Sequence, residues 1–207
     1  MTTPDETLRR KLLLAAFQMP AVASMVSRKS SITNAFVNTL IPQITPSLEE
    51  IEQALAILGI VITDVRCAYC GDKMTEWDHL RPLVVKMRPT GYISEIANLV
   101  PACGKCNQSK GNSSWREWML STTAKHSPTS RGKKDIADRI KRLEEYERWR
   151  PPTRIDDFEA ILGKEAWAAY WRAWEKIIAD LRDCQNVADS LRPKIEKALT
   201  QRLPESK

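Results

Sequence analysis

Four cysteines in two close pairs are the residues of this sequence whose spacing best suits metal chemistry. Cys67 and Cys70 form one Cys-x2-Cys pair, and after a gap of 32 residues Cys103 begins a second pair that ends at Cys106. Thiolates at this spacing can wrap one ion in a turn, and two pairs complete the tetrahedron that Zn²⁺ prefers. Such a closed site has no position for a substrate, so we expect structural zinc. The alternatives are buried free thiols or a redox Cys-x-x-Cys motif.

A second set of residues, between and just after the cysteine pairs, could hydrolyse a phosphodiester. It consists of the dipeptide Asp78-His79 and of Asn107, which follows the second pair directly. A carboxylate and an amide carbonyl are hard oxygen ligands that suit Mg²⁺ or Mn²⁺. A neutral imidazole can take a proton from water near pH 7, and the metal would stabilise the charge that develops on the phosphate. An Asp-His pair alone is a weak sign, since a single histidine is more often structural.

Two short strands and a helix must hold these groups in place. Residues 77–85 have the apolar and β-branched content of a strand, residues 98–102 would form the return strand, and residues 103–110 would begin a helix. Zinc would clamp the two cysteine pairs together and so fix everything between them. The first strand would then present the Asp-His pair beside the helix that carries Asn107.

Three stretches of this segment resemble the HNH endonucleases of the zinc-stapled ββα-metal type. They read Trp77-Asp78-His79-Leu80-Arg81-Pro82, Asn98-Leu99-Val100-Pro101-Ala102-Cys103 and Cys106-Asn107-Gln108-Ser109-Lys110-Gly111. The resemblance covers residues 66–120 and leaves the flanks uncovered. It implies a small zinc-bound ββα-metal core and metal-dependent hydrolysis of DNA with Mg²⁺ or Mn²⁺. It also implies a setting in restriction, phage defence or mobile-element biology.

The same resemblance implies a role for each of four residues. In the family pattern the histidine of the Asp-His pair is the general base and the preceding aspartate is a metal ligand, which implies these roles for His79 and Asp78. The asparagine before the second cysteine pair braces the loop that holds the histidine, which implies this role for Asn98. The residue after the last cysteine of the motif is the other metal ligand, here Asn107.

The sequence departs from the family pattern at two places. Asn107 stands where many members have histidine, a variant that weakens a divalent metal site without removing it. Of the usual two glycines before the second strand only Gly91 is present, so the loop geometry is less defined. The alternative interpretation is a noncatalytic zinc module that binds nucleic acid.

Basic residues that follow the cysteine-rich segment could bind a polyanion. The net charge is +6, and residues 124–155 carry ten basic and five acidic side chains. The candidate DNA contacts are Lys110, on the helix of the second cysteine pair, and the loop residues Arg131, Lys133 and Lys134. The helix after that loop is also basic, but its interleaved glutamates equally favour a solvated face. The expected partner is double-stranded DNA, with RNA as an alternative.

Helices are predicted on both sides of the cysteine-rich segment, so the fold class is mainly α, α+β. Apolar spacing and end signals predict helices over residues 5–19, 47–58, 135–149 and 164–191, the last broken near Pro193. We expect four segments: an N-terminal helical region (1–60), the HNH core (61–123), a basic linker and helix (124–155) and a C-terminal helical region (156–207).

The last predicted helix carries a row of apolar side chains at helical spacing. The row consists of Trp167, Trp171, Trp174, Ile178 and Leu181. Stacking of bases on these rings is conceivable, but packing in a core or a dimer interface is favoured. A symmetric homodimer would suit cleavage of two strands by chains with one active site each.

Composition agrees with a globular protein and with a reducing compartment. The chain is 43% apolar and 28% charged, which is ordinary for soluble proteins. No apolar run approaches the roughly 18 residues of a membrane span, so no membrane partner is expected. Cys184 makes the cysteine count odd, which argues against a disulfide framework. Paired cysteines awaiting zinc imply the cytoplasm as the simplest location.

Overall fold

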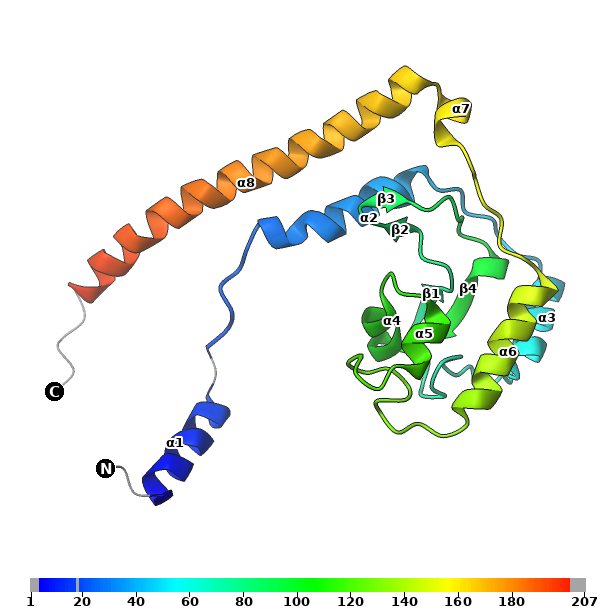
Figure 1. Cartoon of the computed structure of the whole chain (residues 1–207), viewed down its shortest axis with the longest axis horizontal. Helices are drawn as coiled ribbons and strands as arrows, with labels where there is room; N and C mark the ends of the chain where they lie inside the picture. The colour runs from blue at the N-terminus through cyan, green and yellow to red at the C-terminus, as the bar shows by residue number, and fades with distance from the viewer. Residues whose placement is uncertain (1–3, 18, 202–207) are drawn as a thin grey trace. The chain divides into compact units, whose positions relative to one another are not determined.

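The computed structural model describes residues 4–17 and 19–201 and is mainly helical (Figure 1). The chain divides into two compact units, a larger one over residues 29–177 and a smaller one that joins the two ends of the chain. Two two-stranded antiparallel sheets lie within the described part of the larger unit. The predicted α+β class is confirmed. The division into four segments stays a prediction.

A strand pair followed by a short helix forms the centre of the larger unit. β1 (Glu76–His79) pairs antiparallel with β4 (Leu99–Ala102), and Asp78 lies opposite Val100 in this register. α4 (Gly104–Lys110) follows β4 and contacts β1 (Figure 1). The structure therefore contains the two strands and the helix that the sequence predicts, with the Asp-His pair at the end of β1.

The stretch expected to continue the first strand forms a separate hairpin instead. β2 (Val84–Val85) pairs with β3 (Arg88–Pro89), and both are two residues long. Pro82 has no N–H to donate to a strand partner, which explains the break after β1. The turn residues Lys86 and Met87 have φ of 49° and 61°. Two left-handed residues are what the tight turn of a right-twisted hairpin requires.

Gly91 occupies a position at which the loop after this hairpin meets a later segment of the chain. Its φ is +94°, and a Cβ at this position would lie 2.2 Å from the carbonyl oxygen of Ile155. The N–H of Ile155 donates to the carbonyl oxygen of Gly91 at 2.8 Å. The one glycine present in this loop is therefore placed where backbone contact excludes a side chain.

Helices from both sides of the sequence cover the strand pair. They are α3 (Leu48–Leu58), α5 (Trp115–Leu120) and α6 (Ile136–Trp149). Large apolar side chains that are fully buried in this core include Tyr69, Leu80, Val100, Met119, Leu143 and Tyr146. The rings of Tyr69 and Trp118 meet edge to face with centroids 5.3 Å apart. Full burial of one such apolar side chain stabilises the fold by roughly 1.5–3 kcal/mol.

α3 begins and ends where the sequence predicts. Ser47 and Glu50 form a reciprocal capping box at its first turn, and Gly59 ends the helix in the left-handed conformation. Arg150, directly after α6, forms an ion pair with Glu50. This contact joins the start of α3 to the end of α6, and the two helices close the core on one side.

α2 (Lys29–Leu40) lies against the β2–β3 hairpin and is held there by the first part of the long helix α8 (Lys164–Thr200). The buried Trp174 donates its indole N–H to Oγ1 of Thr33 at 3.0 Å. Trp171 is buried beside it. The central tryptophans of the predicted apolar row therefore pack within their own chain, and core packing is confirmed for them.

The smaller unit contains α1 (Pro4–Ala16), the short helix η1 (Val26–Arg28) and the second part of α8. The side chain of Gln185 on α8 accepts a hydrogen bond from the N–H of Met25 at 2.8 Å. No helix among the described residues is both long and apolar enough to cross a membrane.

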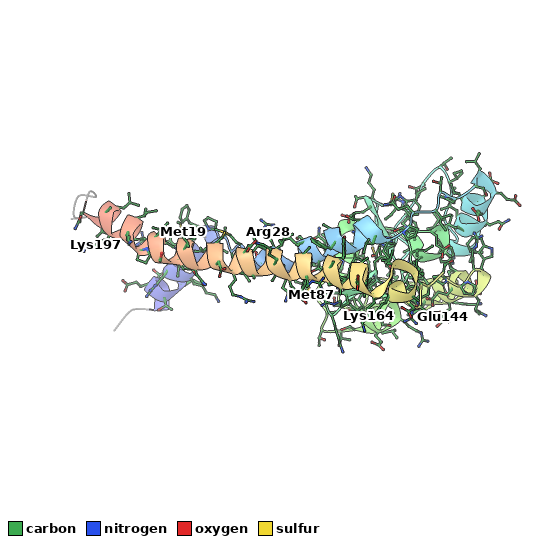
Figure 2. The ribbon with its side chains drawn as sticks, turned by 90° about the horizontal axis from the view of Figure 1, so that it is seen from above. Met19, Arg28, Met87, Glu144, Lys164 and Lys197 are labelled. Atoms are coloured by element: carbon green, nitrogen blue, oxygen red, sulfur yellow. The ribbon has the colours of Figure 1, made fainter. Side chains whose placement is uncertain are left out.

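The predicted break of the last helix near Pro193 is wrong. α8 continues through this residue to Thr200 as one helix (Figure 2). A proline inside a helix removes one backbone hydrogen bond. An ion pair between Arg192 and Glu196, one turn apart, spans the position and supports the helix there.

Candidate functional site

The four paired cysteines are buried together in an arrangement that fits a tetrahedral metal ion. Their sulfur atoms all lie within 4.8 Å of one another, and the Sγ atoms of Cys70 and Cys103 are 3.6 Å apart. Sulfurs at a zinc–sulfur distance of roughly 2.3 Å would stand about 3.8 Å apart in a tetrahedron. Hydrogen bonds with Cys106 and Cys70 lower the pKa of the Cys67 thiol. The cluster therefore suggests a zinc site.

Two of the predicted DNA contacts, Arg131 and Lys133, form ion pairs close to this cluster. Arg131 and Lys133 both form ion pairs with Asp72. The guanidinium of Arg131 also lies 3.8 Å from the sulfur of Cys106, where its charge favours a thiolate. Hydrogen bonds from Lys133 and Arg131 lower the pKa of Asp72 to about 2. Arg131 and Lys133 thus share the single carboxylate of Asp72, and their contact with DNA stays a prediction.

His79 lies at the end of β1 with its ring fixed by a hydrogen bond. Its Nε2 is 2.8 Å from Oγ of Ser94. The segment of Ser94 is itself held by backbone hydrogen bonds with Pro42 and Ile44. Burial, together with the positive charge of Lys110, lowers the pKa of His79 to about 4. The imidazole is therefore neutral near pH 7 and retains a lone pair that can accept a proton.

Asn98 is fully buried and joins two loops beside His79. Its carbonyl oxygen accepts a hydrogen bond from the N–H of Arg81 at 2.7 Å. Its NH₂ group donates to the carbonyl oxygens of Arg81 and Ile93, each at 3.1 Å. One side chain thus uses both ends of its amide on the loop that follows His79, which is the geometry that a brace for the histidine loop needs.

Asp78 is buried and shared between two donors. The hydroxyl of Tyr69 donates to its Oδ2 at 2.6 Å, and the ammonium of Lys110 lies 3.1 Å from the same oxygen. Lys110 also donates to the carbonyl oxygen of His79 at 2.9 Å. Burial raises the pKa of the Asp78 carboxyl, and the charge of Lys110 opposes this rise. The expectation that Lys110 contacts DNA is wrong, because only 1% of this residue is exposed.

Asn107 is oriented by Glu76, a residue that the sequence did not single out. Nδ2 of Asn107 donates to a carboxylate oxygen of Glu76. Because a carboxylate only accepts hydrogen bonds, the NH₂ group must face Glu76. The carbonyl oxygen of Asn107 then points elsewhere and has no hydrogen-bond partner among the described residues. Glu76 precedes Asp78 by two residues on β1, and this same-face spacing is a signal that could have identified it.

The predicted metal ligands and the predicted base share one pocket of about 200 Å³. Asp78, His79 and Asn107 all line it. A carboxylate oxygen and a free amide carbonyl fit Mg²⁺ or Mn²⁺, which bind hard oxygen donors and keep several waters. Asn34 and Asn38, both on α2, line the pocket as well. The pocket thus combines groups for a metal, a base and further polar contacts.

Residues 67–113, which contain the cysteine cluster and the Asp-His pair, match the family model of the HNH endonucleases. This segment is an HNH endonuclease domain. The CRISPR-associated endonuclease Cas9 of Corynebacterium diphtheriae is 39% identical over 62 residues, which cover 28% of this chain and 5% of that protein. The chain thus matches only a small part of the length of this relative. No solved structure matches the chain.

Residues outside the HNH domain support the segment of Ser94 and line the pocket. Ser94 lies inside the domain, but the residues that hold its segment precede the domain by more than twenty positions. Asn34 and Asn38 also come from before it. No local pattern in the sequence marks these residues, because their roles depend on which distant segments the fold brings together. Lys134 is exposed, and its contact with DNA stays a prediction.

Proposed function

We propose that this chain is a metal-dependent endonuclease that hydrolyses phosphodiester bonds in double-stranded DNA. The observation that carries the proposal is that Asp78, His79 and Asn107 line one pocket. A pair of metal-binding oxygens and a neutral imidazole can therefore act on the same phosphate. The match to the HNH family and the similarity to an endonuclease support the class of reaction.

In this proposal His79 is the general base. Its neutral ring accepts a proton from the water that attacks the phosphorus, since its lowered pKa keeps it unprotonated near pH 7. The hydrogen bond with Ser94 orients the ring, and Asn98 braces the loop that follows. Lys110 fixes the carbonyl oxygen of His79 and so positions the end of the strand.

Asp78 and Asn107 are the proposed ligands of Mg²⁺ or Mn²⁺. When bound, such an ion supplies positive charge that stabilises the phosphate oxygens during hydrolysis. Each carboxylate oxygen has more than one lone pair, so Asp78 can bind an ion while it accepts from Tyr69 and Lys110. Glu76 turns the carbonyl oxygen of Asn107 away from itself and leaves it available as a ligand.

We further propose that the cysteine cluster, Cys67, Cys70, Cys103 and Cys106, holds a structural Zn²⁺. Because zinc binding to such a site contributes directly to folding, a strong chelator is expected to unfold the HNH domain. Zinc content and the melting temperature of the purified protein would measure this. Cys103→Ser should lose both zinc and the cooperative transition, whereas Cys184→Ser, at an exposed position, should lose neither. An unchanged transition in Cys103→Ser would contradict the proposal.

Cleavage of a supercoiled plasmid tests the enzyme proposal. The wild-type protein is expected to nick or linearise the plasmid with Mg²⁺ or Mn²⁺ and to lose this activity in a chelator of these ions. His79→Ala should lose cleavage. His126→Ala is the matched control, because His126 is the other histidine of the sequence and is exposed.

The cleavage results distinguish an endonuclease from a noncatalytic nucleic-acid-binding module. Binding without metal-dependent cleavage by the wild type would favour the noncatalytic nucleic-acid-binding module instead. Equal cleavage by His79→Ala would remove the role proposed for this residue. A parallel digest of labelled RNA decides between the two nucleic acids.

Two wider aspects of the function are also proposals. A setting in restriction or phage defence is suggested by the CRISPR-associated relative, and cleavage of modified against unmodified genomic DNA would test it. A homodimer would let two single-site chains cut both strands. The buried Trp171 and Trp174 are not available for such an interface. Sedimentation of the purified protein at several concentrations would measure the oligomeric state.

A further inference from the structure

α2 presents a pair of asparagine amides to the pocket that holds His79 and Asp78. Asn34 and Asn38 are four residues apart, so their side chains lie on one face of the helix, one turn from each other. Both residues are exposed, and both line the pocket. The amide pair therefore shares this pocket with Asp78 and His79 of β1, from an element that lies outside the HNH domain.

The position of this amide pair is fixed by the residues next to it in α2. Thr33 and Val37, each one residue before an asparagine, are 0% and 1% exposed. Thr33 accepts the hydrogen bond from Trp174, and α2 contacts both strands of the β2–β3 hairpin. The buried Thr33 and Val37 anchor α2. As a consequence, Asn34 and Asn38 are held at the pocket.

The side-chain amides of Asn34 and Asn38 do not contribute hydrogen bonds to the described fold. Among the described residues neither side chain has a hydrogen-bond partner in the chain. Asparagine is a poorer helix former than alanine, because its side chain competes for backbone hydrogen bonds. Two such residues in a 12-residue helix weaken it without an internal contact in return. A ligand in the pocket is the partner that the geometry offers.

The chemistry of the pocket wall on this side is uncharged and hydrogen-bonding. An amide offers two donors and one acceptor oxygen, which match the edges of bases and the sugar oxygens of a nucleotide. α2 contains no acidic residue that would repel a polyanion. Asn112 adds another amide to the lining.

We infer that Asn34 and Asn38 hydrogen-bond the nucleotides beside the scissile phosphate and determine which DNA sequences are bound and cut. This inference rests on the proposed endonuclease function and adds a recognition element to it. α2 would lie along the strand that enters the pocket while His79 acts on its phosphate. Neutral amides carry no counterion to release, so their loss should leave the salt dependence of binding unchanged.

Binding and cut-site mapping together test the inference on the full-length protein. Affinity for the duplexes that the wild type selects from a random-sequence pool would be measured by fluorescence anisotropy at several salt concentrations with Ca²⁺. Cut sites would be mapped by sequencing the product ends of the same pool with Mg²⁺. The variants are Asn34→Ala, Asn38→Ala and the double variant. Thr39→Ala is the matched control, because it removes an exposed polar group of α2 that does not line the pocket.

We expect the double variant to lose about tenfold in affinity for the duplexes that the wild type prefers, within the range of good side-chain contacts to bases. Its base preference next to the cut site should be relaxed, and its salt slope should equal that of the wild type. Thr39→Ala should behave as the wild type does. Thermal melting checks that the variants stay folded. We expect no loss of stability, because replacement of asparagine by alanine favours a helix.

The results separate failure of this inference from failure of the endonuclease proposal. Wild-type cleavage with the same affinity and cut sites in the double variant would overturn the inference alone. Absence of wild-type cleavage would overturn the endonuclease proposal, and the affinities in Ca²⁺ would still decide whether the amides contact DNA. Equal affinities of wild type and double variant, or no binding by either, would overturn the inference.

Discussion

The ammonium of Lys110 lies 3.1 Å from the carboxylate of Asp78, and their side chains are 0% and 7% exposed. The same ammonium donates to the carbonyl oxygens of His79 and Gly111. A residue at the end of α4 therefore holds the two neighbouring residues of the Asp-His pair at once. The buried positive charge balances the negative charge of a proposed metal ligand before any metal is bound.

Loss of this ion pair is expected to destabilise the fold strongly. Lys110→Met leaves Asp78 buried without its counter-charge, and breaking such a pair costs about 3 kcal/mol or more. Urea unfolding of the zinc-loaded protein would measure the change in the free energy of unfolding. Lys105→Met, at an exposed lysine of the same helix, should change it by less than about 0.5 kcal/mol. Equal stability of the two variants would contradict the role of the pair.

The hydroxyl of Ser94 is expected to affect the rate of cleavage more than substrate binding. Ser94→Ala removes the hydrogen bond at Nε2 of His79 and lets the ring leave its orientation. We expect kcat to fall roughly 10- to 100-fold with KM nearly unchanged, because misplacement of the proposed base slows the chemical step. Ser113→Ala, at an exposed serine, is the control. A rise in KM with normal kcat would show that Ser94 acts on substrate binding instead.

The contact between Thr33 and Trp174 is expected to hold α2 in place. Thr33→Val conserves the shape of the side chain but leaves the indole N–H of Trp174 without its acceptor. An unsatisfied buried donor costs about 1–3 kcal/mol. Thr39→Val makes the same change at an exposed position of the same helix and should have little effect. Denaturant unfolding of both variants checks this, and similar losses in the two would contradict it.

The lowered pKa of His79 predicts a pH dependence of stability. Between pH 6.5, its ordinary value, and about 4, the unfolded chain binds a proton at this imidazole and the folded chain does not. Stability from this group is therefore complete above pH 6.5 and decreases as the pH falls. Without added Mg²⁺, the wild type should lose stability relative to His79→Gln between pH 7 and pH 5. A constant difference between the two proteins would contradict the shift.

The parts that the sequence predicts well are those set by local spacing. The two cysteine pairs and the Asp-His dipeptide are each a few residues long, so residue type and spacing in the sequence are enough to identify them. The capping box of α3 is local in the same sense, and its start and end are confirmed. The strand–strand–helix order of the metal-binding core follows from these local signals, because the cysteine cluster joins the two ends of the segment.

The parts that the sequence predicts poorly depend on distant partners. Charge and position in the sequence predict DNA contacts for Lys110 and Arg131, but burial and the carboxylates of Asp78 and Asp72 decide where their charges act. The sign of a side chain's charge is known from the sequence, whereas the partner of that charge depends on the tertiary structure. Pro193 is a different case: α8 continues through it, and the ion pair between Arg192 and Glu196, one turn apart, spans the position.

Because Pro42 and Ile44 hydrogen-bond the segment of Ser94, a nuclease fragment for use in a fusion protein must begin before these residues. A protein engineer who fused only residues 67–113 to a new targeting module would leave these supports behind, together with α2 and its anchor on α8. The compact unit over residues 29–177 carries all of them. That unit is therefore the cassette to move. On the inference that Asn34 and Asn38 contact bases, exchange of α2 within it is expected to change targeting while the proposed catalytic groups stay unchanged.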